Sequence, residues 1–285
     1  MVQTFGGCTL SLIPVRTEPA DRSELCTQLL FGDAYSVLAL SPDEKWLHIR
    51  IAADGYTGWI DRGQHWAISE EAYCSLSRPD LPFVSEACAR LFYPQTGQSQ
   101  WLCRGSYLPF LVNPGLQGPD LPPWQWEAPC SLPPQTLSQK TLRHWAESYQ
   151  YSPYLWGGKS PWGIDCSGFT QMVFRMSGFA LWRDARQQAT QGQEIPIREA
   201  QTGDLAFFAR QGKVVHVGIV IAPEEVIGEA LYPAFPRQSG EYYIWHALDQ
   251  VRLDKLDARG IFHLQRQVYT HELHSLRHYG AKPED

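Results

Sequence analysis

The hydrophobic pattern of the first part of the chain predicts short β-strands. Runs of β-branched and aromatic residues are separated by turn signals, and residues 46–52 alternate between apolar and polar side chains. An alternation with period two is typical of a half-buried strand, and the Asp54-Gly55 pair that follows is a hairpin signal. These runs predict a small SH3-like β barrel at residues 1–66 and, from a weaker repeat of the same texture, a second one at 67–115.

The last part of the chain changes to a helical period and then returns to strands. Residues 141–151 place apolar side chains at i, i+3, i+4 and i+7, and residues 166–178 repeat this stripe before a glycine at 178. Both segments therefore predict amphipathic helices. Five strand-like runs follow, at 205–209, 214–222, 224–231, 241–248 and 260–268. Helices first and closely spaced strands later predict an α+β domain over 136–285 with a mostly antiparallel sheet.

Proline dominates the segment between these two parts. Residues 116–135 contain six prolines together with Trp124 and Trp126. Proline lacks the backbone donor that helices and central strands require. We therefore interpret 116–135 as an ordered linker that its tryptophans hold against a surface.

Composition and charge exclude several classes of protein. The net charge of -6 gives no basic face for nucleic acid, and no stretch is long and apolar enough for a membrane helix. The first residues lack the pattern of a secretory leader, although a leader trimmed from this start stays compatible with the sequence. Seven cysteines, an odd number without the close spacing of zinc ligands, indicate reduced thiols in the cytoplasm and no structural metal.

Cys166 is the candidate nucleophile. It begins the second predicted helix, where unpaired N–H groups and the helix dipole favour a thiolate. The same N–H groups can stabilise the oxyanion of a tetrahedral intermediate. A cysteine at a helix start is more often a small buried residue, so this position alone is weak support.

Two histidines extend the candidate site. His216 lies within an apolar run that predicts a strand, next to Gly218, and a cysteine at a helix end facing a histidine on a strand is the papain arrangement. A lone strand histidine is more often structural, but the pair with Cys166 reverses that preference. His246, on the next predicted strand, can hold the second ring nitrogen of His216 and select its tautomer.

Several segments together resemble the NlpC/P60 family of cysteine peptidases. They are residues 154–158, 163–169, 202–208, 216–219, 245–247 and 251–254. The upstream part resembles bacterial SH3 domains, and the whole is similar to γ-D-glutamyl-L-diamino acid endopeptidases of the dipeptidyl-peptidase VI type. The resemblance implies a papain-like catalytic domain preceded by two SH3-like barrels, without metal or organic cofactor. It assigns Cys166 as nucleophile, His216 as base and His246 as the orienting residue.

The resemblance also implies a substrate. Relatives of this type act on murein tri- and tetrapeptides and require a free amino-terminal L-Ala. On that basis Asp165 and Tyr56 are expected to bind the ammonium group, because a primary ammonium favours anionic and phenolic acceptors. A second acid is expected from the first barrel, with Glu24 as the candidate and Asp33 as the alternative.

Further residues follow from the same resemblance. Tyr154, Trp156 and Ser167 are expected to line the γ-D-Glu subsite. The segment 183–185 reads Arg-Asp-Ala where relatives carry Ser at the third place, which puts one carboxylate contact in doubt and leaves the role of Arg183 open.

The spacing of His271, His274 and His278 resembles a metal-binding face on a helix. Histidines near a chain end are more often solvated, and we expect that here. The Gly203-Asp204-Leu205 run is expected to be a tight turn into a strand.

The resulting hypothesis is a monomeric enzyme of cell-wall peptide recycling. It would hydrolyse the bond between γ-D-Glu and a diamino acid, whose identity the sequence does not specify, through a thioester at Cys166. One rival is a hydrolase of intact peptidoglycan stems outside the cytoplasm. The other is a non-catalytic wall-binding module, against which the complete Cys/His/His set argues.

Overall fold

The computed structural model describes residues 4–111, 125–126, 128–222 and 242–280. The chain divides into two compact units. The first unit contains residues 1–134 and 155–163, and the second contains residues 135–154 and 164–285.

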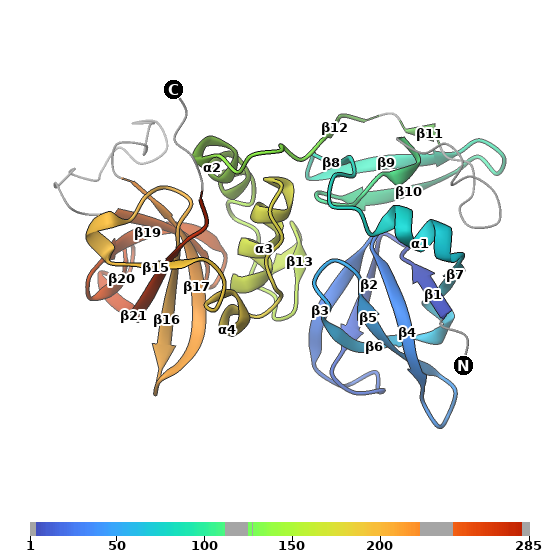
Figure 1. The fold of residues 1–285 in the computed structure, drawn as a ribbon, viewed down its shortest axis with the longest axis horizontal. Helices are drawn as coiled ribbons and strands as arrows, with labels where there is room; N and C mark the ends of the chain where they lie inside the picture. Colours follow the sequence, from blue (N-terminus) through green and yellow to red (C-terminus); the bar gives the residue numbers. More distant parts are fainter. Residues whose placement is uncertain (1–3, 112–124, 127, 223–241, 281–285) are drawn as a thin grey trace. The chain divides into compact units, whose positions relative to one another are not determined.

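A seven-stranded antiparallel sheet forms the centre of the first unit (Figure 1). Its strand order is β3-β2-β6-β5-β4-β1-β7. The strands are β1 (Thr4–Gly7), β2 (Leu12–Arg16), β3 (Leu25–Leu30), β4 (Ala34–Leu40), β5 (Trp46–Ile51), β6 (Thr57–Asp61) and β7 (Trp66–Ile68). The half-buried strand predicted at 46–52 is confirmed, because Leu47, Ile49 and Ile51 of β5 join the core while Arg50 is exposed. Gly55, at φ 71°, occupies the left-handed conformation that the predicted β5–β6 hairpin requires.

Smaller elements complete the first unit. The helix α1 (Glu70–Leu76) begins after Ser69, whose side chain accepts a hydrogen bond from Ala72 N. The short strands are β8 (Phe83–Val84), β9 (Cys88–Tyr93), β10 (Gln98–Cys103), β11 (Gln125–Trp126), β12 (Cys130–Ser131) and β13 (Lys159–Ser160). Single 3-10 turns lie at Arg62–Gln64 and Pro109–Leu111. The sheets β10-β9-β11 and β12-β8 enclose their own apolar cluster around Leu91.

Two of these strands lie in the segment expected to be a linker. β11 pairs with β9, and β12 pairs with β8. β11 lies at the edge of its sheet, where a proline-rich segment is tolerated. Residues 112–124 and 127 lie outside the described part of the chain, and the second SH3-like barrel stays a prediction.

A second seven-stranded sheet with helices beside it forms the second unit (Figure 1). Its order is β15-β21-β16-β17-β18-β19-β20, and an additional β20–β21 pairing closes six of the strands into a ring. The strands are β15 (Gln193–Ile195), β16 (Leu205–Arg210), β17 (Lys213–Ile221), β18 (Tyr242–Ala247), β19 (Val251–Asp257), β20 (Gly260–His263) and β21 (Val268–His278). The helices are α2 (Gln139–Ser148), α3 (Cys166–Met176) and α4 (Ala185–Gln188), with β14 (Gly163–Ile164) before α3 and a 3-10 turn at Ile197–Glu199.

The structure confirms both predicted helices and the antiparallel strand pairing of this unit. It is richer in sheet than an α+β layout suggests, and the strand predicted at 224–231 lies outside the described residues. Over the ranges that the structure covers, no helix is long and apolar enough to cross a membrane.

Candidate active site

Cys166 is the first residue of α3. Asp165 caps this helix, because its Oδ1 accepts a hydrogen bond from Gly168 N at 2.6 Å. Every residue of α3 except Arg175 is buried, and the helix packs against β17. The sequence thus presents the sulfur at the amino end of a core helix, beside the strand that carries His216.

Burial dominates the ionisation of Cys166. Burial, followed by the charge of Asp165, raises the pKa of the thiol to about 12, although backbone hydrogen bonds from Val217 and Ser167 oppose this rise in part. The helix start was expected to favour a thiolate, but desolvation of the buried sulfur outweighs that effect. The Val217 contact places the sulfur beside the residue that follows His216.

His216 is buried in β17 and rests as a neutral imidazole. Burial, followed by the charges of His246 and His271, holds its pKa well below the usual value. Gly218, two residues on, lies so close to β18 that an added Cβ would be 2.7 Å from the Ile244 side chain. A glycine is therefore needed here for the β17–β18 contact, rather than to admit another group beside His216.

A chain of hydrogen bonds runs from His216 to a buried carboxylate. His216 Nε2 lies 2.8 Å from His246 Nδ1, and His246 Nε2 lies 3.1 Å from Asp254 Oδ2. If Asp254 is ionised it can only accept, so His246 donates from Nε2 and accepts at Nδ1. His216 must then donate from Nε2, which leaves its Nδ1 unprotonated and able to act as a base.

Asp254 is held in its ionised form. Burial alone would raise its pKa, but hydrogen bonds from His246 and Arg252 outweigh burial and bring the pKa below its ordinary value. Arg252 Nε donates to Oδ2 at 2.7 Å, and Leu264 N donates to Oδ1 at 2.9 Å. Asp254 lies in a segment that resembles the family, but nothing in its spacing predicts that it meets His246.

Arg183 forms a buried ion pair with Asp165, the residue before Cys166. Its Nη1 and Nη2 donate to Asp165 at 3.0 and 2.6 Å, and Nη1 also donates to Ser167 Oγ at 2.9 Å. Arg183 is 1% exposed, so a side chain whose role was open from the sequence is part of the core. Asp165 and Ser167 thus already have protein partners, and their substrate contacts stay predictions.

Tyr154 lies within electrostatic reach of the same groups. Burial raises the pKa of its hydroxyl, and the charges of Cys166 and Asp165 raise it further. A short parallel bridge joins Tyr154 to Ile164, two residues before Cys166. Tyr154 is therefore placed beside Cys166.

The match with known families agrees with this geometry. Residues 151–267 match the NlpC/P60 family, and residues 15–64 match the bacterial dipeptidyl-peptidase SH3 domain. The chain therefore contains an NlpC/P60 domain and a bacterial SH3 domain.

Its relatives carry peptidase names. A gamma-D-glutamyl-L-lysine dipeptidyl-peptidase of Bacillus subtilis is 44% identical over 72 residues, which is 24% of this chain and 24% of that protein. Dipeptidyl-peptidase 6 of Lysinibacillus sphaericus is 28% identical over 226 residues, 67% of this chain and 76% of the relative. A crystal structure of an NlpC/P60 family protein from Bacillus cereus has a TM-score of 0.72 at 19% identity and covers 97% of this chain and 99% of that one. The last likeness concerns the fold alone, and the chain spans about a quarter of the length of the first relative.

The predicted substrate residues of the first unit have different surroundings. Glu24 is exposed and its Oε1 accepts a hydrogen bond from Trp156 Nε1 at 2.6 Å. Asp33 is 3% exposed, and its Oδ2 accepts from Leu30 N at 2.9 Å within the β3–β4 turn. Tyr56 is half-buried against the SH3 core. Glu24 is thus the more accessible of the two candidate acids.

The segment 155–163 of the NlpC/P60 domain is fixed against β3 within the first unit. Besides the Glu24–Trp156 bond, Lys159 N donates to Gln28 Oε1 at 2.8 Å. Gly157 has φ 76°, and a Cβ there would lie 2.3 Å from the backbone oxygen of Leu25. These contacts fix the position of Trp156 relative to Glu24.

The expectation that the three carboxy-terminal histidines are solvated was wrong for His271 and His278. His271, His274 and His278 lie on the strand β21 rather than on a helix, and only His274 is exposed. His278 Nδ1 lies 2.7 Å from Asp204 Oδ1 in the turn before β16, and the ring of His271 stacks on His216. Within the described ranges, no group of three or more His, Cys, Asp or Glu could hold a metal ion.

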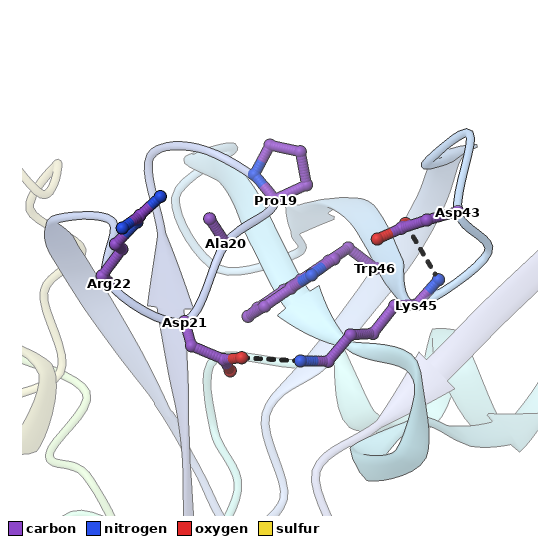
Figure 2. Close-up of a pocket in the computed structure, with 7 residues that line it drawn as sticks. All are labelled: Pro19, Ala20, Asp21, Arg22, Asp43, Lys45 and Trp46. Carbon is purple, nitrogen blue, oxygen red and sulfur yellow. Dashed lines mark hydrogen bonds and ion pairs between the residues drawn. The ribbon is translucent and has the colours of Figure 1, made fainter.

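A separate hollow of about 380 Å³ lies on the first unit (Figure 2). It is lined by Pro19, Ala20, Asp21, Arg22, Asp43, Lys45 and Trp46. Lys45 is exposed but already paired with Asp21 at 2.6 Å, and Trp46 is 3% exposed, so the cation has an anionic partner and the indole is buried. The lining contains no nucleophile or histidine.

Proposed function

We propose that this chain is a cysteine endopeptidase of cell-wall peptides. In this proposal it hydrolyses the bond between γ-D-Glu and a diamino acid in murein tri- and tetrapeptides with a free amino-terminal L-Ala. The observation that carries it is the hydrogen-bond chain from Asp254 through His246, which leaves Nδ1 of His216 as a base beside the Cys166 helix start. The peptidase names of the relatives support the same reaction class.

Acylation begins with Cys166 and His216. The sulfur attacks the side-chain carbonyl carbon of γ-D-Glu while its proton passes to His216 Nδ1, so that two buried neutral groups become charged only during the attack. The N–H groups at the start of α3 stabilise the oxyanion. Collapse of the tetrahedral intermediate breaks the C–N bond, and His216 gives its proton to the departing amine.

Deacylation uses the same base in reverse. A water molecule gives a proton to His216 Nδ1 as it attacks the thioester, and the Cys166 sulfur leaves and recovers its proton. Asp254 stays ionised throughout and stabilises the imidazolium through His246. The reaction consumes one water molecule and needs no metal or organic cofactor.

Recognition of the substrate amine is a finer part of the proposal. The resemblance assigns it to Asp165, Tyr56 and an acid of the first unit. We favour Glu24 as that acid, because Asp33 is buried in a turn. Both proposed acids already have protein partners, because Arg183, Ser167 and Gly168 donate to Asp165 and Trp156 donates to Glu24.

The γ-D-Glu subsite, the arrangement of the fold and the location are also proposed. Tyr154, Trp156 and Ser167 line the subsite, and Ala185 supplies no hydroxyl to it. The helix of Cys166 packed on the strand of His216 supports a papain-like arrangement. All seven cysteines are free thiols, which supports action on recycled peptides in the cytoplasm.

A panel of stem peptides tests the proposed function. Peptides with free or acetylated L-Ala, and with different diamino acids after γ-D-Glu, are incubated with the full chain, and the products are identified by mass spectrometry. We expect cleavage after γ-D-Glu and a kcat/KM at least about 100-fold lower for acetylated peptides, because acetylation removes the charge that the acids bind.

Variants of the first unit sharpen this test. Glu24→Gln should lower kcat/KM about 10–100-fold on the free peptide and cause no further loss on the acetylated one, while Glu18→Gln, at another exposed acid, should match the wild type on both. Equal rates on free and acetylated peptides would favour the hydrolase of intact stems. Absence of cleavage of any peptide would favour the non-catalytic wall-binding module.

Asp254→Asn should lower kcat about 10–100-fold with little change in KM. The neutral amide no longer selects the donating Nε2 of His246, so the tautomer of His216 is no longer determined. Steady-state kinetics on the free peptide measure the effect. Asp249→Asn, at an exposed carboxylate paired with Arg266, is the matched control, and a kcat for Asp254→Asn equal to that of this control would refute the relay.

A further inference from the structure

The strand β21 lies beyond the part of the chain that matches the NlpC/P60 family. The match ends at residue 267, and β21 spans Val268–His278. β21 nevertheless pairs with β16 on one side and β20 on the other, so it closes the ring of strands in the second unit (Figure 1). It is therefore an integral strand of the unit that contains Cys166.

His271 of β21 covers one face of the His216 ring. The two ring centroids are 4.2 Å apart and the planes differ by 19°, which is a stacked arrangement. The His271 ring also has edge contacts with Phe208 of β16 at 5.9 Å and with His246 of β18 at 6.4 Å. Its Nδ1 lies 3.0 Å from Thr270 Oγ1. His271 is thus held from several elements.

This stacking supplies a restraint that the hydrogen-bond chain lacks. The bond between His216 Nε2 and His246 fixes one ring atom, and the ring can still tilt about that point. A flat ring at van der Waals distance opposes such a tilt. We propose that His271 is a positioning residue that holds the plane of the His216 imidazole and thereby keeps Nδ1 directed at Cys166. This inference rests on the proposed function and extends it to a residue outside the family match.

The ionisation of His271 is compatible with this role. Burial, and next the charge of His246, lower its pKa to about 4. The groups that face it are His216, His246 and Phe208 from three other strands, with Thr270 on its own strand. At neutral pH the His271 ring is uncharged, so it does not repel the imidazolium that forms on His216 during acylation.

Three variants test the role of His271. His271→Ala removes the stacked ring and should lower kcat about 10-fold with KM within about two-fold, because general-base efficiency depends on alignment. His271→Phe retains a flat ring and should keep kcat within about three-fold of wild type. His274→Ala, at the exposed histidine on the same strand, is the control. Kinetics are measured at neutral pH, well below the thermal midpoint of each variant.

A second measurement separates this inference from the proposed function. The rate at which iodoacetamide alkylates Cys166, followed by mass spectrometry of its tryptic peptide, reports the Cys166–His216 pair without a peptide substrate. It should fall in His271→Ala and recover in His271→Phe. A kcat and an alkylation rate for His271→Ala equal to those of His274→Ala would overturn the inference, as would a Phe variant as impaired as the Ala variant. If the wild type cleaves no peptide but the alkylation pattern holds, the proposed function fails and the positioning role stands.

Discussion

Cys166→Ala should abolish peptide hydrolysis and leave the fold intact. Loss of a nucleophile that forms a covalent intermediate typically lowers kcat by about 10⁴-fold or more. The substitution removes only one sulfur atom from the start of α3, where Asp165 still caps the helix. We therefore expect no product peak by liquid chromatography and mass spectrometry, together with unchanged circular dichroism.

Two companion variants make this result specific. Cys166→Ser should also be inactive, because a hydroxyl is far harder to deprotonate than a thiol in a buried site. Cys74→Ala, at an exposed thiol of the first unit, should retain full activity. Cleavage by Cys166→Ala at more than a few per cent of the wild-type rate would assign the nucleophile elsewhere.

Arg183→Met should destabilise the second unit by about 3–5 kcal/mol. Removing one partner of a buried ion pair leaves an uncompensated charge, here on Asp165 at the start of α3. A change of this size lowers the thermal midpoint by about 10 °C in a domain of this size. Calorimetry of the full chain measures the shift, and hydrogen exchange of residues 166–176 shows whether it arises at α3.

Two further variants serve as comparisons for Arg183→Met. Arg183→Lys keeps the charge but cannot donate to both oxygens of Asp165 in the same fork, so we expect an intermediate loss. Arg186→Met, at an exposed arginine nearby, should change stability by less than about 0.5 kcal/mol. A midpoint for Arg183→Met equal to that of Arg186→Met would mean that the ion pair contributes nothing to the folded unit.

Local pattern was sufficient for the elements that carry the site. The apolar stripe of residues 166–178 and the glycine at 178 predicted α3, and alternation predicted β5 and the strand of His216. These features depend on the period of side chains along one segment and on its capping residues. Residues that are close in the sequence are therefore sufficient to predict them. The candidate nucleophile and base could be named for the same reason, because each lies at a recognisable place on its own element.

The residues that surround Cys166 and His216 are brought there by contacts between segments that are distant in the sequence. Nothing in the spacing of Arg183 shows that it pairs with Asp165, and the ring of His271 meets His216 only because β21 closes the sheet beside β16. The spacing of the carboxy-terminal histidines resembles that of one helix face. Strand pairing decides their conformation instead, and they lie on β21. A short segment near a chain end carries too little pattern to resolve the two.

The sequence by itself determined the recognisable motifs of the domains, the helix that begins at Cys166 and the strands that carry His216 and His246. Only the tertiary structure decided the ionisation and orientation of these groups. Burial keeps Cys166 and His216 neutral at rest, and Asp254 reaches His246 across two paired strands. The physical reason is that desolvation and hydrogen bonding depend on which side chains surround an atom in space, and residues distant in sequence supply most of them.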